Sequence, residues 1–78
     1  MYRLSVTKLR EAAAKSGDTS GHAIARTTGI AESSIYRILN GEAQPGLNTA
    51  LRLASAYEIS VEDLMQRVDD ERTEGVAA

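Results

Sequence analysis

The chain lacks cysteine, phenylalanine and tryptophan, and it contains one proline and one histidine among 78 residues. Without cysteine it can form no disulfide and no thiolate-ligated zinc or iron–sulfur centre. The lone histidine, His22, argues against a zinc site of any other kind, because such sites need several ligands. We therefore expect no metal and no cofactor, and a fold that depends on side-chain packing alone.

Long hydrophobic runs are also missing. No apolar segment approaches the roughly 20 residues needed to span a bilayer, and the N-terminal sequence MYRLSVTKLR has no apolar stretch of the kind found in signal peptides. We expect a soluble, cytoplasmic protein without membrane contact. Because the chain has room for only one small domain, we also expect no small-molecule ligand.

The few residues capable of catalysis do not make a convincing site. Asp18, Ser20 and His22 lie close together in the sequence, but a catalytic triad also needs a pocket and an oxyanion hole, which so short a chain can barely supply. The loop GDTSG at 17–21 lacks the Lys-Ser/Thr ending of a phosphate-binding loop. The sequence therefore predicts a protein that is not an enzyme.

Charge is distributed unevenly along the chain, whose net charge is −2. Residues 1–61 contain seven basic and five acidic groups, whereas residues 62–78 contain two basic and six acidic groups. The mildly basic body is compatible with a nucleic-acid partner. We expect one domain over residues 1–68, followed by an acidic, disordered tail over residues 69–78.

Composition and apolar spacing both favour packed helices. Twelve alanines and the absence of Phe and Trp suit close contacts between helices better than a sheet. Ser5, Ser20 and Ser60 are candidate N-caps, and Gly29 and Gly41 are candidate helix ends. We predict an all-α bundle of five short helices. The stripes expected to be buried are Leu4, Leu9, Ala12 and Ala13; Ala23, Ile24 and Thr27 or Thr28; Ile35, Ile38 and Leu39; Leu47, Ala50, Leu51, Ala54 and Tyr57; and Val61, Leu64, Met65 and Val68.

The segment GIAESSIYRILNG at 29–41 predicts a helix-turn-helix made by the second and third helices. A short turn that begins at a glycine lets two helices meet at a large angle. Ile35, Ile38 and Leu39 share the inner face of the helix that follows. The outward side chains are suited to hydrogen bonding in a major groove, and they include neither lysine nor glutamate, which a helix exposed only to solvent would favour. These outward residues are Ser33, Tyr36, Arg37 and Asn40, flanked by Glu32 and Ser34.

Residues 20–64 resemble the Cro and lambda-repressor type of helix-turn-helix, often called the XRE family. The similarity rests on IA in the second helix, Gly29-Ile30 at the turn, SSIYRILNG as recognition helix, Pro45 before the fourth helix, TALRLASAYEIS, and the closing VEDL. This resemblance implies a five-helix domain, usually dimeric, that binds a pseudo-palindromic operator in double-stranded DNA and regulates transcription. We expect a repressor that acts as a homodimer.

The resemblance also implies contacts for particular residues. The positions that read bases or contact the backbone in the family correspond to Glu32, Ser33, Ser34, Tyr36 and Arg37. Phosphate contacts are implied for Asn40 and for the start of the second helix, where backbone N–H groups and the helix dipole attract an anion. That start comprises Ser20, Gly21 and His22.

Three residues depart from the family pattern. Gly21 stands where members commonly have a glutamine that bridges phosphate and recognition helix. Ala31 replaces a serine that often caps the third helix. Leu39 replaces a glutamate that many members pair with an arginine of the first helix, here Arg10. The first departure bears on the DNA contacts and not on the fold.

The sequence leaves two alternatives open. A protein-interaction module on the same fold, such as an antitoxin or an anti-repressor, would bind its partner through the fifth helix and the acidic tail. In so short a fifth helix not every apolar side chain can be buried, so the surplus either forms a homodimer seam or completes the monomer core. The candidate seam consists of Val61, Leu64, Met65 and Val68.

Overall fold

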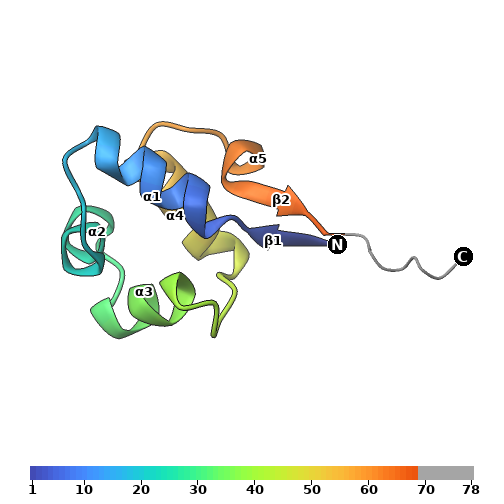
Figure 1. Cartoon of the computed structure of the whole chain (residues 1–78), viewed down its shortest axis with the longest axis horizontal. Helices are drawn as coiled ribbons and strands as arrows, with labels where there is room; N and C mark the ends of the chain where they lie inside the picture. The colour runs from blue at the N-terminus through green and yellow to red at the C-terminus, as the bar shows by residue number, and fades with distance from the viewer. Residues whose placement is uncertain (69–78) are drawn as a thin grey trace, which may run out of the picture.

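The computed structural model describes residues 1–68, in which five helices pack together and two short strands pair beside them (Figure 1). The predicted bundle of five helices is confirmed, and the small sheet is an addition. No helix among the described residues is long and apolar enough to cross a membrane. The acidic tail predicted at 69–78 lies outside the described residues. In chain order the elements are β1 (Tyr2–Leu4), α1 (Val6–Lys15), α2 (Gly21–Thr28), α3 (Glu32–Leu39), α4 (Leu47–Ala56), α5 (Val61–Leu64) and β2 (Met65–Arg67).

The predicted helix boundaries agree with the capping geometry. The hydroxyls of Ser5, Ser20 and Ser60 each accept a hydrogen bond from the backbone N–H three residues later, at 3.2, 3.1 and 3.0 Å respectively. Gly29 ends α2 with φ of 75°, and Gly41 follows α3 with φ of 78°. Both angles lie in the left-handed region, which glycine adopts without steric cost.

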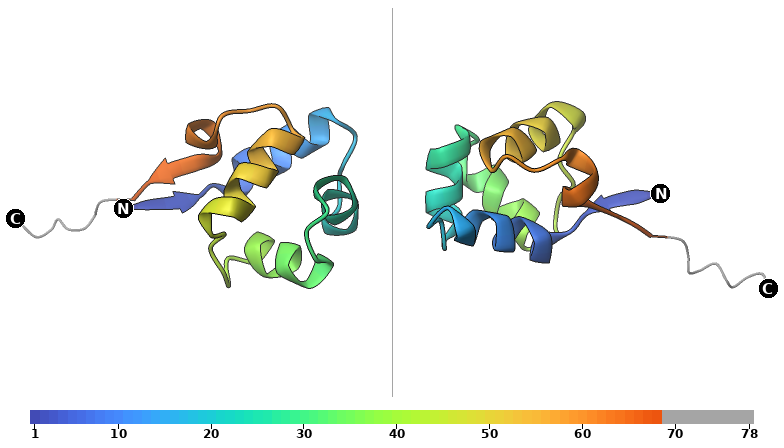
Figure 2. Two further views of the ribbon diagram at one scale, coloured as in Figure 1. Left: turned by 180° about the vertical axis from the view of Figure 1, so that it is seen from behind. Right: turned by 90° about the horizontal axis from the view of Figure 1, so that it is seen from above.

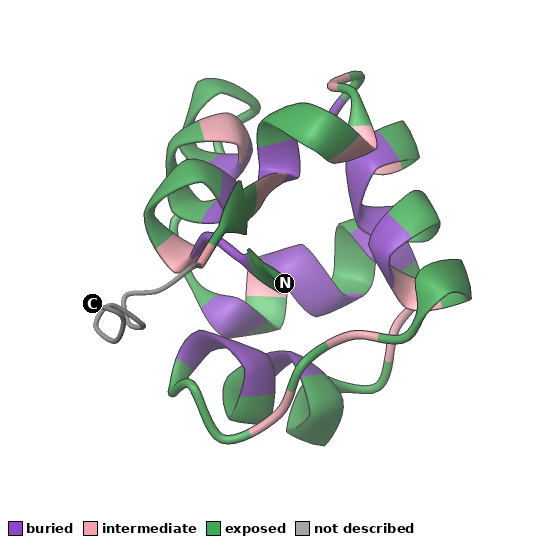
Figure 3. Ribbon diagram, turned by 90° about the vertical axis from the view of Figure 1, so that its right-hand side faces the viewer, coloured by how far each residue is buried: buried purple, intermediate pink, exposed green. Residues whose placement is uncertain are grey.

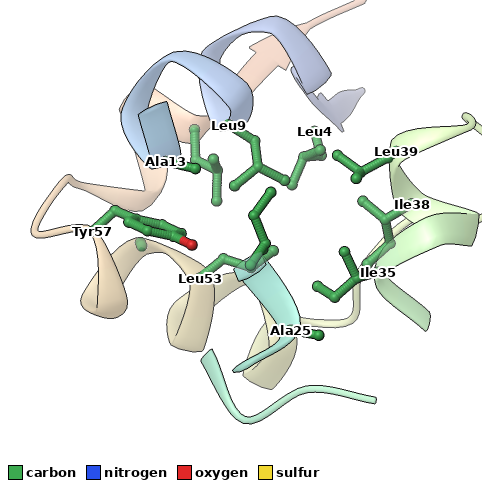
Figure 4. Packing of buried hydrophobic residues seen from close by; sticks show 12 residues of the cluster. Leu4, Leu9, Ala13, Ala25, Ile35, Ile38, Leu39, Leu53 and Tyr57 are labelled. Atoms are coloured by element: carbon green, nitrogen blue, oxygen red, sulfur yellow. The ribbon is translucent and has the colours of Figure 1, made fainter. Parts of the chain in front are cut away.

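One hydrophobic core joins all five helices and β1. Its largest fully buried side chains are Leu9, Ile24, Ile35, Leu53 and Leu64. In Figure 4, side chains of α1, α3 and α4 point toward one another around the centre of this cluster. Figure 3 shows the matching pattern on the ribbon, with buried residues on the inner sides of the helices and exposed residues on the outer sides. Packing between helices therefore supplies the stability that other small domains obtain from disulfides or metals.

The buried face of α4 differs from the prediction. Leu47 and Leu51 are 72% and 46% exposed, whereas Leu53, which was not predicted to be buried, is fully enclosed. The apolar residues of this helix form two overlapping stripes, and the stripe that contains Leu53 and Tyr57 faces the core. A smaller difference occurs in α2, where Ala25 is buried in place of Ala23.

The end of the chain that follows Ser60 also differs from the prediction. The helix there is a single turn, Val61–Leu64, and Met65–Arg67 forms a strand antiparallel to Tyr2–Leu4. The expected helical stripe of Val61, Leu64, Met65 and Val68 is therefore wrong beyond Leu64. The cause is a distant partner, because the N-terminal segment supplies backbone hydrogen bonds that a local pattern cannot reveal.

The two strands form a ribbon that extends away from the helices in both views of Figure 2. Leu4 lies opposite Met65 and Tyr2 lies opposite Arg67. Leu4, expected on the stripe of the first helix, instead reaches the core from β1. Its backbone N–H donates to Gln44 Oε1 at 2.9 Å, which ties the ribbon to the loop before α4.

A buried tyrosine and a carboxylate connect the loop after α1 to two other helices. Asp18 Oδ2 accepts hydrogen bonds from the hydroxyls of Thr27 at 2.6 Å and Tyr57 at 2.8 Å. The bond from Thr27, and then that from Tyr57, lowers the pKa of Asp18 below its ordinary value of 3.8. Burial, together with the neighbouring carboxylate, raises the pKa of the Tyr57 phenol well above its usual range.

We expect Tyr57→Phe to lower the free energy of unfolding by about 1 kcal/mol, because the ring stays buried while one hydrogen bond is lost. Urea unfolding at pH 7 measures this effect.

The pKa of Asp18 is lower in the folded chain than in the unfolded one, so its contribution to the free energy of unfolding is present above pH 3.8 and is lost as the pH falls below that value. Urea unfolding of the wild type between pH 7 and pH 2 should show this loss, and Asp18→Asn should reduce it. An identical acid profile for Asp18→Asn would contradict the assignment.

The start of α3 has no side-chain cap. Ala31 is the N-cap residue, with φ of −55° and ψ of 137°, but its side chain offers no acceptor for the first free N–H groups. We expect Ala31→Ser to raise the free energy of unfolding by about 1 kcal/mol. Thermal unfolding measures the effect, and Ala31→Val, which cannot cap, is the matched control. A gain of equal size in both variants would exclude capping as its cause.

Candidate nucleic-acid interface

Helices α2 and α3 pack against each other across a tight turn, as predicted for a helix-turn-helix (Figure 1). The turn is held by Thr28, whose buried hydroxyl donates to the Ile24 carbonyl at 2.8 Å and accepts from the Ile30 N–H at 3.3 Å. Gly29 then reverses the chain in the left-handed conformation. The angle between the two helices therefore depends on local backbone geometry and on their shared core.

The two faces of α3 differ in character, as the sequence predicts. Ile35, Ile38 and Leu39 are buried in the core, whereas all the outward residues singled out above are exposed. Leu39, which replaces the family's glutamate, is thus a core residue. Arg10 accordingly makes no side-chain hydrogen bond or ion pair within residues 1–68. Burial of one face fixes the helix and leaves the other face available for a partner.

Four outward side chains of α3 have no partner within residues 1–68. We call them the reading face. Hydroxyl, guanidinium and amide groups of this kind donate and accept hydrogen bonds at base edges and phosphates. Because they form no hydrogen bonds within the described chain, no internal bond has to break when they meet a ligand. The reading face consists of Ser33, Ser34, Arg37 and Asn40.

Glu32, by contrast, is held by a side chain of α2. Its Oε2 atom lies 2.9 Å from His22 Nδ1, across the two helix starts. The contact is an ion pair when His22 is protonated and a hydrogen bond when the neutral ring carries its proton on Nδ1. A carboxylate in a nucleic-acid interface repels phosphates, and the ion-pair form of this contact offsets that charge.

The Tyr36 ring packs against a glycine of α2. A Cβ atom added at buried Gly21 would lie 2.7 Å from Tyr36 Cε1 and 2.9 Å from Cζ, closer than real Cβ contacts. The ring therefore rests against the backbone of α2, while the side chain remains 43% exposed. No sequence pattern predicts this contact. The family resemblance marks Gly21 as the loss of a bridging side chain, and the ring that occupies the space beside it belongs to a residue fifteen positions away.

The residues for which phosphate contacts are implied fall in two places. Ser20, Gly21 and His22 lie at the start of α2, where the Ser20 hydroxyl already accepts from the Ala23 N–H. Asn40 follows the last turn of α3. At 1.5 Å per residue it is about 12 Å from Glu32 along the helix axis. The structure thus gathers Glu32 and Tyr36 with the start of α2, and leaves Asn40 at the far end of α3.

One neighbour of the reading face was not predicted. Thr49, in the first turn of α4, lines a shallow hollow of about 160 Å³ together with Ser34, Arg37 and Gln44. In the sequence it could be recognised only as a helical residue, because the loop that brings it beside α3 has no local signal. Within residues 1–68 no group of three or more His, Cys, Asp or Glu side chains could hold a metal ion.

The fold leaves fewer residues available for the candidate dimer seam than the sequence predicts. Leu64 is fully buried in the core of its own chain, so it offers no surface to a partner. Val61, Met65 and Val68 are half-buried. Val61 and Met65 line an open hollow of about 560 Å³ with Tyr2 and Glu62, beside the ribbon.

Comparisons with known proteins identify the architecture but no individual relative. Neither the curated proteins nor the solved structures include a significant match to this chain. A family model described as helix-turn-helix matches residues 8–64, which is more than half of the chain and includes α2, the turn and α3. The chain therefore belongs to the XRE-type helix-turn-helix family of DNA-binding transcription regulators.

Proposed function

We propose that this protein is a repressor that binds a pseudo-palindromic operator in double-stranded DNA as a homodimer and reads it through the major groove. The observation that supports base reading most directly is the reading face of α3, four exposed polar side chains without a partner in residues 1–68. A recognition helix presents such side chains to base edges. In a symmetric dimer the two copies of α3 would enter successive major grooves, about 34 Å apart.

Individual roles follow from side-chain chemistry. The Arg37 guanidinium matches the two acceptors of guanine, O6 and N7, and Ser33 and Ser34 can bond to several bases. Glu32 keeps its second carboxylate oxygen for a cytosine amine, and the exposed Tyr36 side chain offers a hydroxyl to a base edge or a phosphate. Asn40 and the start of α2, at Ser20, Gly21 and His22, are the proposed phosphate contacts.

We expect Arg37→Ala and Asn40→Ala to affect binding in different ways. Arg37→Ala should weaken binding to a selected operator by about 1–3 kcal/mol, and by less when the operator is changed at the base pair that Arg37 reads. Asn40→Ala should weaken binding to all sequences alike, because a phosphate contact contains no sequence information. Selection from random double-stranded DNA, followed by titration of each variant, measures both effects.

The matched control for Arg37→Ala is Arg52→Ala, which removes the same charge from an exposed residue of α4. Its effect should be small and independent of sequence. Equal affinity of wild type and Arg37→Ala for the selected operator would refute the proposed base reading. If selection returns no motif at all, the protein-interaction alternative is favoured.

Homodimerisation is proposed through the ribbon and the adjoining hollow. A sheet of two strands is stabilised when further structure covers it. The Leu4 and Met65 N–H groups are already bonded to Gln44 Oε1 and to the Val61 carbonyl, so the proposed contact is made by side chains. Side chains alternate along a strand, so Tyr2 and Leu4 lie on the same face of β1. Leu4 is buried in the core, and Tyr2 continues this face beyond the core. Together with half-buried Val61 and Met65, Tyr2 gives a second copy an apolar surface to cover.

We expect Tyr2→Lys to weaken the dimer by at least about tenfold, because it places a charge in the proposed apolar seam. Equilibrium sedimentation at tens of micromolar protein, with and without operator DNA, measures the association. Leu51→Lys places the same charge on an exposed leucine of α4, outside the seam, and should leave the association unchanged. A wild type that is monomeric both in solution and on DNA would exclude this seam.

A further inference from the structure

We propose that Gly21 and Tyr36 act as an interlocking pair that sets the position of the reading face, and that Gly21 thereby determines base preference without touching a base. This inference rests on the DNA-binding function proposed above. It assigns a role to a residue that has no side chain and is buried. Gly21 is therefore a positioning residue, and the Tyr36 ring is the part through which it acts.

The Gly21–Tyr36 contact joins α2 and α3 near their N-termini. Glu32 and Tyr36 are four residues apart and so lie on the same side of α3, one turn from each other. Their partners His22 and Gly21 are neighbours in the first turn of α2. Two contacts one turn apart resist both sliding and rotation of α3 against α2. The aromatic contact is the stiffer of the two, because it involves only the two side-chain torsions of Tyr36, whereas the other contact involves the torsions of both His22 and Glu32.

The fit of the ring depends on the missing Cβ. With a methyl group at position 21 the nearest ring atom would be 2.7 Å away, which forces the ring or the helix to move. The ring is 43% exposed and is not part of the core cluster, so relieving the overlap does not open the core. Alanine is also a better helix former than glycine. The added methyl group is therefore expected to disturb recognition much more than folding.

A displaced ring changes binding because hydrogen bonds to base edges tolerate little misplacement. The start of α2 is the proposed phosphate anchor, and α3 contains the reading face. The Gly21–Tyr36 contact sets the distance between the two. A shift at this contact moves the reading face relative to the anchored backbone, so the base contacts and the Asn40 phosphate contact deteriorate together while the phosphate contacts at the start of α2 persist. The expected signature is a loss of selectivity for the operator over unrelated DNA.

The test is a double-mutant cycle on operator binding. Gly21→Ala should lower the affinity for the selected operator by about tenfold or more, and lower the affinity for unrelated DNA much less. In the Tyr36→Ala background the same methyl group meets no ring, so Gly21→Ala should change operator affinity less than about twofold. The double variant is the matched control, since it contains the same methyl group without its obstacle.

Two further variants separate the ring from its hydroxyl and remain informative if Gly21→Ala fails to fold. Tyr36→Phe keeps the ring and loses only the hydroxyl, so it should relax the selected motif less than loss of the whole ring does. Tyr36→Leu loses the ring and should relax that motif. Nuclear Overhauser contacts between the Tyr36 ring protons and the Gly21 α-protons report the interlock in the free protein, without DNA.

Several outcomes would overturn the proposal. One is an equal loss of affinity on Gly21→Ala in both backgrounds, and another is wild-type selectivity in Gly21→Ala or in Tyr36→Leu. Absence of the Gly21–Tyr36 nuclear Overhauser contact would also exclude it. A wild type that selects no operator overturns the DNA-binding function as well, which distinguishes that failure from a failure of the interlock alone.

Discussion

The burial of one face of α3 is the interaction on which the rest of the molecule depends. The helix has eight residues and no side-chain cap, so it would be unstable in isolation. It forms because Ile35, Ile38 and Leu39 complete a core built by every other helix. The inward side chains hold the helix in place, whereas those of Ser33, Ser34, Arg37 and Asn40 have no partner within residues 1–68.

The elements around α3 act mainly by fixing α2 and the ends of the bundle. Asp18 accepts hydrogen bonds from Thr27 of α2 and from Tyr57 at the end of α4, so α2, which packs against α3, is tied to the loop after α1 and through it to α4. At the other end, β2 replaces the expected continuation of the last helix and secures the first residues of the chain. A small core without disulfides or metals depends on such cross-links between distant segments.

The features predicted correctly from the sequence are those that depend on near neighbours. Serine caps, glycine ends and the inner face of α3 all involve residues within four positions of one another. The errors and omissions involve distant partners. The strand at Met65 forms only beside β1. Burial of Leu53 instead of Leu51 depends on the assembled core, and the position of the Tyr36 ring depends on Gly21. A departure from a family pattern, such as Gly21, can therefore mark a compensating residue elsewhere in the fold.

The modest charge of the chain makes geometry more important for recognition. A net charge of −2 and a carboxylate at the start of α3 leave little general attraction for DNA, so few phosphate contacts are available to tolerate a misplaced helix. With the proposed function, non-specific binding is weak and the preference for an operator comes from base contacts held in register. Under that condition a contact that holds α3 against α2, as Tyr36 does at Gly21, affects specificity more than an additional surface lysine would.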